Sequence, residues 1–505
     1  VESPVYRQHL GLWDHQKYFV KKAYDDHQKE YGARYVLADQ VGLGKTIQLA
    51  MSAQLMALKG DNPVLIIVPK TLMYQWQEEL NELLDLPSAI WDGKNWIDEN
   101  DIKYPNKGRK DIVKCPRKIG IISQGLITSG SSVCDSLLNK KYECVIVDEA
   151  HRARRRNLGI GKESHTPDMN NLYEYLIKLS IKTHSMLLAT ATPMQMYPVE
   201  LWDLLNILSQ KNDSVLGSQI SNWRKRSSLS EGLEIVMGQK EIETLEMDNW
   251  DWVRNPFPPR DEKEPKFSVL RNKFNMKDKD FVIRKSYVEL NSIESTLISN
   301  LVTGGFFKDY NPYIRHVIRR EREYLENKIN DVTGEPYLQK IKVELHGERD
   351  KDAIELNGYM KQAYEIAEEF CKLLSRRVRS GGLFKTLLLR RIGSSLEAGK
   401  NTGLKLLDEW NLDSNLLNEE DEIDEDNISS ELKDLTEEET KLLKNFVDVL
   451  NSNQATDPKY HKIIELLEDQ NWIEKGTIIF SQYFDSAYWI AKKLSDYLTS
   501  KPIAL

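Results

Sequence analysis

Short, continuous apolar runs alternate with longer amphipathic segments along the first part of the chain. The apolar runs have the length of strands that are buried on both faces, and the segments between them have helical spacing. These runs are 35–37, 63–69, 118–123, 142–147 and 185–189. Such alternation predicts an α/β fold in which helices flank a parallel sheet. Because ligands bind beyond the carboxyl ends of strands in these folds, the residues after each run are the candidates for chemistry.

The residues after the first run have the pattern of a phosphate-binding loop. Gly42 and Gly44 let the backbone curl so that successive N–H groups and the start of a helix point at one anion. Lys45 would place its ammonium group on the outer phosphates, and Thr46 would offer a hydroxyl to Mg²⁺. Asp39 stands where a general loop has glycine, so a turn that only caps a helix is the alternative. The expected nucleotide-binding residues of the loop are Gly42, Leu43, Gly44, Lys45 and Thr46.

The segment 10–20, which has the pattern of a turn followed by an amphipathic helix, lies shortly before this loop. On its own it predicts an ordinary surface helix. Close ahead of a phosphate loop, however, Gln16 could use both faces of its amide against adenine, one donating and one accepting. We therefore expect Gln16 to read the base of a bound nucleotide.

The fourth apolar run ends in two adjacent acids, Asp148 and Glu149. Carboxylates beside a buried strand are costly unless a cation or hydrogen bonds satisfy them. We expect Asp148 to hold Mg²⁺ and Glu149 to polarise the water that attacks the terminal phosphate. A strand that ends in an acidic helix cap would explain Asp148, but it would leave the phosphate loop without a partner. The loop and the acids together predict nucleotide hydrolysis, with Lys45 as a third catalytic residue.

Hydroxyl and basic side chains follow the acids and the fifth run. Thr190 and Thr192 could bond the acidic motif and sense the terminal phosphate, or they could form a plain turn before a helix. We group both with His151 as residues that couple nucleotide to the rest of the molecule. The arginine-rich segment 152–156 could grip phosphate, or it could be a solvated loop.

These motifs, in this order, resemble those of superfamily 2 helicases, and their details resemble the Swi/Snf family of double-strand DNA translocases. In that family Asp39 is the expected loop residue, whereas Gln40 replaces a glutamate. The acidic segment 148–152 and the threonine segment 190–195 are similar to family motifs. The segments 200–208 and 475–484 are also similar to family segments, while 311–322 and 387–398 most resemble the bacterial RapA/HepA-like branch.

The resemblance implies an ATPase that uses ATP and Mg²⁺ to move along duplex DNA with two RecA-like lobes. It implies contacts with the DNA backbone, so sequence preference should be weak. Trp76 belongs to one of the two family segments that touch DNA. The residues that the resemblance assigns to nucleic acid are Pro69, Lys70, Ser123, Gln124, Ser481 and Gln482.

The same resemblance sets the expected domain organisation. We expect a first RecA-like ATP-binding lobe at 1–208, a helical insertion at 209–310 and a return segment that completes the lobe at 311–345. A helical protrusion with an acidic linker would follow at 346–455, and the start of a second RecA-like lobe at 456–505.

Three features inside these domains carry expectations of their own. Trp223, Trp250 and Trp252 in the insertion could stack on nucleic acid, but core positions are favoured. The acidic run 419–426 should stay solvated as a linker, with shielding of a DNA groove as the alternative. The apolar run 477–480 matches the first strand of the second lobe.

Composition narrows the class of protein. The net charge of −8 excludes a wholly basic nucleic-acid coat protein but permits local basic grooves. No stretch approaches the roughly 18 apolar residues that span a bilayer, and the start of the chain lacks a signal-peptide pattern. We therefore expect a soluble intracellular protein, and the resemblance to the RapA/HepA-like branch implies the bacterial cytoplasm. Val1 in place of methionine suggests a piece of a longer chain.

The family resemblance leaves function and setting partly open. An arginine from the second lobe is worth roughly 10³ to 10⁵ in rate, and the segment 480–505 offers no candidate. We therefore expect residues 1–505 to bind ATP and Mg²⁺ but to hydrolyse ATP weakly on their own. Besides DNA, the expected partners are proteins of a transcription-recycling or anti-phage defence complex. The alternatives are an RNA or duplex-unwinding helicase, and a nucleotide-gated binding subunit with little turnover.

Overall fold

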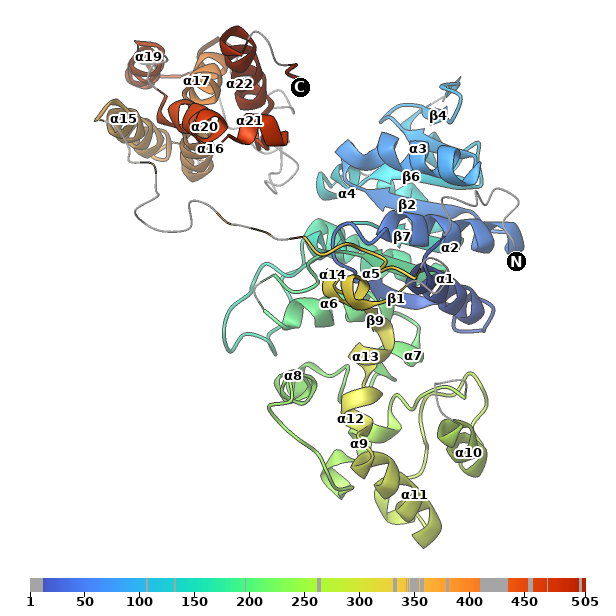
Figure 1. The fold of residues 1–505 in the computed structure, drawn as a ribbon. Helices are drawn as coiled ribbons and strands as arrows, with labels where there is room; N and C mark the ends of the chain where they lie inside the picture. The colour runs from blue at the N-terminus through green and yellow to red at the C-terminus, as the bar shows by residue number, and fades with distance from the viewer. Residues whose placement is uncertain are drawn as a thin grey trace. The chain divides into compact units, whose positions relative to one another are not determined.

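Figure 1 shows the chain as a computed structural model. The structure describes residues 12–498 and 502–505, except 106–107, 131–132, 196, 261–264, 330–333, 342, 344, 346–353, 355–357, 378–380, 409–434, 453–456 and 470. The chain divides into two compact units, Val1–Lys340 and Ile341–Leu505, and each is described by itself. The acidic run at 419–426 lies outside the described residues.

The first unit is built on a sheet that has nine strands in the part of the chain that the structure describes. The strands lie in the order β5-β4-β3-β6-β2-β7-β8-β1-β9, and the neighbours from β3 to β9 are parallel. β4 and β5 continue the β3 edge in the antiparallel sense. The bounds are β1 Arg34–Leu37, β2 Val64–Val68, β3 Ser88–Trp91, β4 Trp96–Asp98, β5 Lys103–Tyr104, β6 Ile119–Ser123, β7 Tyr142–Val147, β8 Thr183–Ala189 and β9 Val317–Ile318. The predicted α/β fold with a mostly parallel sheet is confirmed.

The five apolar runs of the sequence form β1, β2, β6, β7 and β8. Alternate residues of β2 enter the two cores, Val64 and Ile66 on one face and Leu65 and Ile67 on the other. The strands that the sequence analysis did not predict, β3, β4, β5 and β9, lie at the two edges of the sheet. They lack the continuous apolar run of a strand that is buried on both faces, which is why the hydrophobic pattern missed them.

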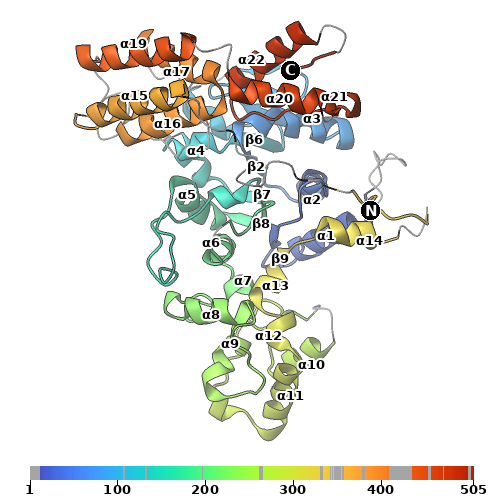
Figure 2. The same ribbon diagram turned by 60° about the vertical axis from the view of Figure 1, so that its left-hand side comes forward.

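Helices cover both faces of the sheet, as Figure 2 shows. On one face the bounds are α1 Asp14–His27, α2 Lys45–Lys59 and α3 Met73–Leu84. On the other face they are α4 Gly125–Thr128, α5 Asn171–Ser180 and α6 Val199–Leu208. The helices α2 to α6 each follow a strand, so their first turns lie at the same edge of the sheet as the carboxyl ends of those strands, whereas α1 precedes β1.

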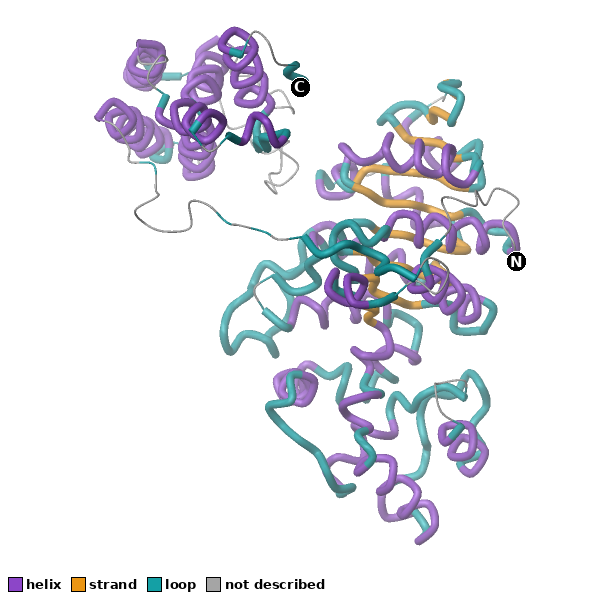
Figure 3. Tube along the Cα trace, in the orientation of Figure 1, coloured by secondary structure: helices purple, strands orange, loops and turns teal. Residues whose placement is uncertain are grey.

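Between α6 and β9 the chain leaves the sheet as a helical insertion, whose predicted bounds of 209–310 stay a prediction and which Figure 3 shows as helices joined by loops. Its helices are α7 Asp213–Leu216, α8 Leu229–Val236, α9 Trp250–Arg254, α10 Lys266–Lys273, α11 Ser292–Thr303, α12 Phe306–Asp309 and α13 Pro312–His316. Trp223, Trp250 and Trp252 are buried, and the Trp223 indole donates to the Trp252 backbone oxygen at 2.9 Å. These tryptophans are core residues, as the favoured interpretation predicted.

In the second unit, helices α15, α16, α17 and α19 share one core, which includes Phe370, Leu388 and Phe446. The helices of this unit are α15 Gly358–Leu374, α16 Gly381–Ser394, α17 Leu396–Asp408, α19 Glu437–Ser452, α20 Pro458–Glu468, α21 Trp472–Lys475 and α22 Phe484–Tyr497. No helix in the described part of either unit has the length and apolar character needed to cross a membrane.

The strand predicted at 477–480 is not formed in this structure. These residues are coil, and the Phe480 side chain is 91% exposed. A parallel strand needs a neighbour to satisfy its backbone N–H and C=O groups, and the described residues of the second unit form helices and loops only. The local apolar pattern was therefore insufficient, because strand formation depends on a pairing partner.

A buried histidine network fastens α1 to the sheet. His27 Nδ1 lies 2.8 Å from the Ser185 hydroxyl on β8, and its Nε2 lies 3.4 Å from a Glu143 carboxylate oxygen on β7. The Ser185 hydroxyl also accepts the backbone N–H of Ala33 and is fully buried, so this Ser–His–Glu group is structural. Burial, with a smaller contribution from His184, lowers the pKa of His27 to about 4.

We predict that this histidine makes the protein less stable in mild acid. His27 of the unfolded chain takes up a proton near pH 6.5, whereas in the folded protein it does so near pH 4. The stability is therefore complete above pH 6.5, and about 3 kcal/mol of it is lost as the pH falls to 4. Urea titrations at a series of pH values should show a smaller loss for His27→Asn than for wild type. His165→Asn changes an exposed histidine of the same unit and is the control. Equal slopes for wild type and His27→Asn would contradict the prediction.

Candidate active site

The predicted phosphate loop connects β1 to α2 at the carboxyl edge of the sheet. Gly42 and Gly44 have φ angles of +84° and +71°, a left-handed backbone that favours glycine. A side chain at Gly44 would overlap the amide nitrogen of Gln16, which lies against the loop. Lys45 is the first residue of α2, and the half-buried Thr46 is the second. The loop therefore ends in the exposed backbone N–H groups of a helix start, which is a favourable position for an anion.

Lys45 lies among acidic groups. Its ammonium donates to the backbone oxygens of Asp39 at 2.7 Å and Gln40 at 3.4 Å. Burial lowers the pKa of Lys45, and the carboxylates of Asp148, Glu149 and Asp39 oppose this change. The fold thus brings together the lysine and the two acids that the sequence analysis placed in one catalytic group.

Asp39, the loop residue that departs from glycine, is a buried anchor. Its side chain is 0% exposed and accepts from Arg320 Nη1 at 3.0 Å and from Gln48 Nε2 at 3.1 Å. The backbone N–H of Gln40 donates to the Arg320 backbone oxygen, and the Gln40 side chain accepts the backbone N–H of Arg322. The segment after β9 therefore holds the loop on one side. Arg320 was not among the predicted site residues, although a buried acid at position 39 needs a cation nearby.

Gln16 holds α1 against the other side of the loop. Its Oε1 accepts the backbone N–H of Trp13 at 2.9 Å, and its Nε2 donates to the backbone oxygen of Leu43 at 3.2 Å. Nε2 of the neighbouring His15 lies 3.3 Å from the same oxygen, and burial lowers the pKa of His15. Both faces of the Gln16 amide contact protein backbone, while the role of Gln16 as an adenine reader stays a prediction.

Asp148 follows β7 and is held by three elements. Its Oδ2 accepts the indole N–H of Trp76 on α3 at 3.0 Å, and its Oδ1 accepts the backbone N–H of Glu149 at 2.9 Å. Its backbone oxygen accepts the Gln124 side-chain amide at 2.6 Å. Burial raises the pKa of Asp148, although the indole hydrogen bond opposes this change. The carboxylate is fixed in orientation at the carboxyl edge of the sheet.

Glu149, His151 and Thr190 form a chain of contacts from the acids to the end of β8. Nδ1 of His151 lies 3.2 Å from a Glu149 carboxylate oxygen and 3.0 Å from the Thr190 hydroxyl. The Thr190 oxygen also accepts the backbone N–H of Thr192 at 3.1 Å. The hydrogen bond from His151 lowers the pKa of Glu149, which keeps this carboxylate ionised. The residues predicted to couple nucleotide to the rest of the molecule are thus in contact.

The predicted nucleic-acid residues differ in accessibility. Lys70 is exposed, Ser123 is half-buried and Pro69 is buried, at the ends of β2 and β6. Trp76 and Gln124 face inward: both side chains are buried and donate to Asp148. The contact of Pro69, Lys70, Ser123 and Gln124 with nucleic acid stays a prediction. The helical spacing of Met73, Trp76 and Leu80, all buried on one face of α3, could have indicated a core position.

The two candidates from the second unit lie in the turn before α22. Ser481 is half-buried, and its hydroxyl donates to the Tyr483 backbone oxygen at 3.1 Å. Gln482 is exposed. Their contact with nucleic acid stays a prediction.

The arginine-rich segment after the acids contains a buried structural residue. Arg155 is 1% exposed, and its guanidinium donates to both carboxylate oxygens of Asp203 on α6, with the shortest contact at 2.7 Å. Tyr173 on α5 donates to the same carboxylate at 3.1 Å. Arg155 therefore neither grips phosphate nor lies in a solvated loop; it ties the acidic motif to the two helices below it.

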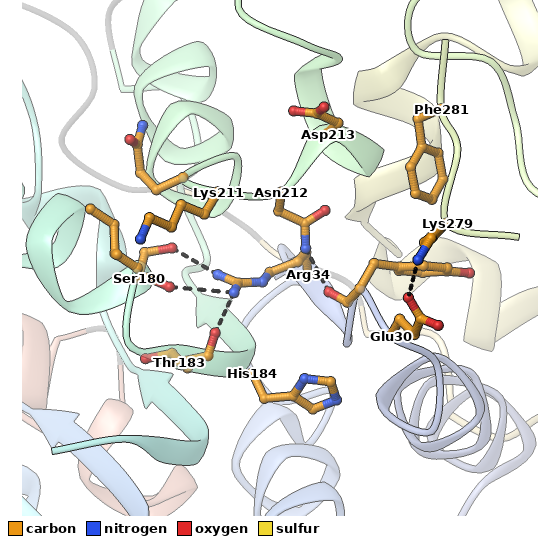
Figure 4. Close-up of a pocket in the computed structure, with 13 residues that line it drawn as sticks. Glu30, Arg34, Ser180, Thr183, His184, Lys211, Asn212, Asp213, Lys279 and Phe281 are labelled. Atoms are coloured by element: carbon orange, nitrogen blue, oxygen red, sulfur yellow. Dashed lines mark hydrogen bonds and ion pairs between the residues drawn. The ribbon is translucent and has the colours of Figure 1, made fainter. Parts of the chain in front are cut away.

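A pocket of about 490 Å³ lies at the opposite edge of the sheet, beside the amino ends of β1 and β8 (Figure 4). The Arg34 guanidinium in its wall donates to the Ser180 hydroxyl at 2.7 Å and to the backbone oxygens of Ser180 and Thr183. Ser180 ends α5, and the negative end of a helix suits a buried cation. The described residues that line this pocket include none of the predicted site residues, so it is separate from the acids and the phosphate loop.

Residues 15–237, which contain the phosphate loop, the acids and the threonine motif, match the family described as SNF2-related domain. This part of the chain is an SNF2-related domain. The resemblance to the Swi/Snf family is thereby confirmed.

Several relatives are bacterial proteins named RNA polymerase-associated protein RapA. The protein of Pectobacterium atrosepticum is 32% identical over 176 residues, which cover 34% of this chain and 16% of the relative. That of Actinobacillus pleuropneumoniae serotype 3 is 23% identical over 282 residues, which cover 55% of this chain and 27% of the relative. The matched region thus spans about a quarter or less of these relatives.

Two solved structures are also similar to this chain. One is described as the Sulfolobus solfataricus SWI2/SNF2 ATPase core in complex with dsDNA, with 15% identity, 99% of this chain and 73% of that chain covered, and a TM-score of 0.36. The other is the Pyrococcus furiosus Hef helicase domain, with 14% identity, 95% and 78% covered, and a TM-score of 0.34.

We predict that the Arg155–Asp203 pair is essential for the stability of the SNF2-related domain. Asp203→Ala leaves a buried guanidinium without its anion, which should lower the free energy of unfolding by about 3–5 kcal/mol. Glu174→Ala is the control, since it breaks an exposed pair with Lys178 that is worth about 1 kcal/mol or less. Urea unfolding measures both variants, and equal losses would refute the buried role.

Proposed function

We propose that this chain belongs to an ATP-driven motor that hydrolyses ATP with Mg²⁺ and translocates along double-stranded DNA. The observation that carries the proposal is the gathering of Lys45, Asp148 and Glu149 at one sheet edge, with Glu149 joined to Thr190 through His151. The SNF2-related domain supports the same reading.

The phosphate loop would bind the nucleotide. Its glycines and the first N–H groups of α2 would receive phosphate oxygens, and Lys45 would exchange its backbone acceptors for the outer phosphates. Gln16, which already fixes the loop through Leu43, would present the free lone pair and hydrogen of its amide to adenine.

Asp148 and Thr46 fit a magnesium ion, because Mg²⁺ uses few protein oxygens and completes its shell with water and phosphate. Both Asp148 oxygens accept an N–H donor and keep further lone pairs for a metal or its waters. When bound, Mg²⁺ would neutralise charge on the phosphates. Glu149, kept ionised by His151, would orient the attacking water. Through His151, Thr190 would transmit a change at the Glu149 carboxylate to the end of β8.

Duplex DNA would contact the carboxyl ends of β2 and β6 through Lys70 and Ser123, and the second unit through Ser481 and Gln482. Such contacts to phosphates give little sequence preference. We further propose a bacterial cytoplasmic setting with protein partners, either in transcription-complex recycling, which would suit a relative of RNA polymerase-associated proteins, or in anti-phage defence.

We predict that Lys45→Ala lowers ATP turnover at least about 100-fold, since it removes a charge that stabilises the transferred phosphoryl group. Glu149→Gln should retain nucleotide binding and lose about 10²- to 10⁴-fold in turnover. Steady-state ATPase assays of the full-length protein with and without duplex DNA measure both effects. Lys59→Ala, at the exposed end of the same helix, is the control. Retained DNA-stimulated turnover in Lys45→Ala would refute the assignment.

We predict that the motor moves along duplex DNA without separating its strands. Triplex displacement should therefore be ATP-dependent, while strand displacement from a forked duplex of DNA or RNA should be absent. Strand displacement would favour the helicase alternative. Absence of ATP turnover in the full-length protein, with DNA binding that responds to nucleotide, would favour a nucleotide-gated binding subunit. That residues 1–505 alone hydrolyse ATP only weakly stays a prediction, measured in the same assay.

A further inference from the structure

The proposed metal ligand Asp148 is held by side chains from both segments that lead to the proposed DNA contacts. Trp76 lies six positions after Lys70, and its indole N–H reaches Asp148 Oδ2 at 3.0 Å. Gln124 directly follows Ser123, and its amide reaches the Asp148 backbone oxygen at 2.6 Å. Each connection runs from the carboxyl end of a strand to the same residue, from β2 on one side and β6 on the other.

The path from Lys70 to Trp76 is stiff. A 3-10 turn at Lys70–Leu72 continues directly into α3, which begins at Met73. The Trp76 side chain is 2% exposed and packs in the core formed with Met73 and Leu80. A displacement of the exposed Lys70 end would therefore move the indole as part of the helix, because close-packed cores transmit shifts rather than absorb them.

The hydrogen bond from Trp76 to Asp148 can form in one direction only, with the indole as the donor. An indole N–H is a donor only, so it can hold the ionised oxygen of Asp148 but offers nothing to a metal. Donors of this kind around a metal-binding carboxylate orient it, and their loss typically costs about 10–100-fold in metal affinity or activity. Trp76 thus has the position of such a donor while belonging to the segment that carries Lys70.

We propose that Trp76 is a positioning residue that transmits DNA binding at the ends of β2 and β6 to the Asp148 carboxylate. The inference rests on the proposed function and adds a physical route by which DNA would stimulate hydrolysis. Gln124 is the second arm of this route, fixing the backbone of Asp148 while Trp76 fixes its side chain.

The test is Trp76→Phe in the full-length protein, which keeps an aromatic ring in the core and removes the N–H. Trp91→Phe is the matched control: Trp91 is buried on β3 in the same unit, and its indole N–H has no hydrogen-bond partner among the described residues. Three quantities are measured: the Mg²⁺ dependence of fluorescent ATP-analogue affinity, duplex affinity without nucleotide, and the ratio of DNA-stimulated to unstimulated turnover.

We expect Trp76→Phe to require about tenfold more Mg²⁺ for nucleotide binding and to lose most of the DNA stimulation. For Trp76→Phe, the affinity for duplex DNA and the affinity for nucleotide in EDTA should stay within about twofold of wild type. For the control Trp91→Phe, all measured quantities should stay within about twofold of wild type. Gln124→Leu, which removes the second arm, should lower the stimulation ratio in the same direction and serves if Trp76→Phe does not fold.

Two results would overturn the inference. One is an Mg²⁺ requirement and stimulation ratio in Trp76→Phe equal to those in Trp91→Phe. The other is an equal fall of stimulated and unstimulated turnover, which would make Trp76 a support for Asp148 without a link to DNA. A wild-type protein without ATP turnover would contradict the proposed function instead, and the Mg²⁺-dependent binding assay would still test the hold of Trp76 on Asp148.

Discussion

The buried ion pair between Asp39 and Arg320 connects the beginning of the first unit to a segment near its end. Asp39 lies fully buried in the phosphate loop, and Arg320 follows 281 residues later in the chain, after the helical insertion. A buried carboxylate needs a cation, so the loop can keep this residue only if the chain returns to it. β9 makes that return by pairing with β1, which places Arg320 beside the loop. The phosphate loop is thus completed by residues from both sides of the insertion.

The pairing of β9 with β1 explains how the long insertion between α6 and β9 leaves the geometry of the phosphate loop intact. The entropic cost of closing a loop grows only slowly with its length, so a helical excursion between α6 and β9 is inexpensive once its ends are fixed. Its ends are fixed by secondary structure: α6 packs on the sheet, and β9 extends it. In the insertion Trp223 packs against Trp252, and both belong to the same hydrophobic core as one face of the sheet, which makes the insertion a packed body rather than a loose loop.

The sequence indicated the central strands, the phosphate loop and the acids because their signals are local. A buried parallel strand is a short apolar run, and the residues that follow it lie at the ligand-binding edge. Partners that come from elsewhere in the chain had no such signal. Arg320 is remote from Asp39, and Asp203 is remote from Arg155, so neither pair could be read from neighbouring positions. Trp76 carries two signals: its motif resembles a family segment that touches DNA, whereas its helical spacing indicates the core.

The backbone of Glu149 is strained. Its φ angle of +46° lies in the left-handed region, which is unfavourable for a residue with a side chain by about 1 kcal/mol or more. Glycine or asparagine would occupy this backbone with less strain, yet neither could supply a carboxylate to His151. The identity of residue 149 is therefore set by chemistry against the preference of the backbone. Selection for higher stability alone should therefore favour replacement of Glu149, and each such substitution would relieve the backbone strain but remove the carboxylate.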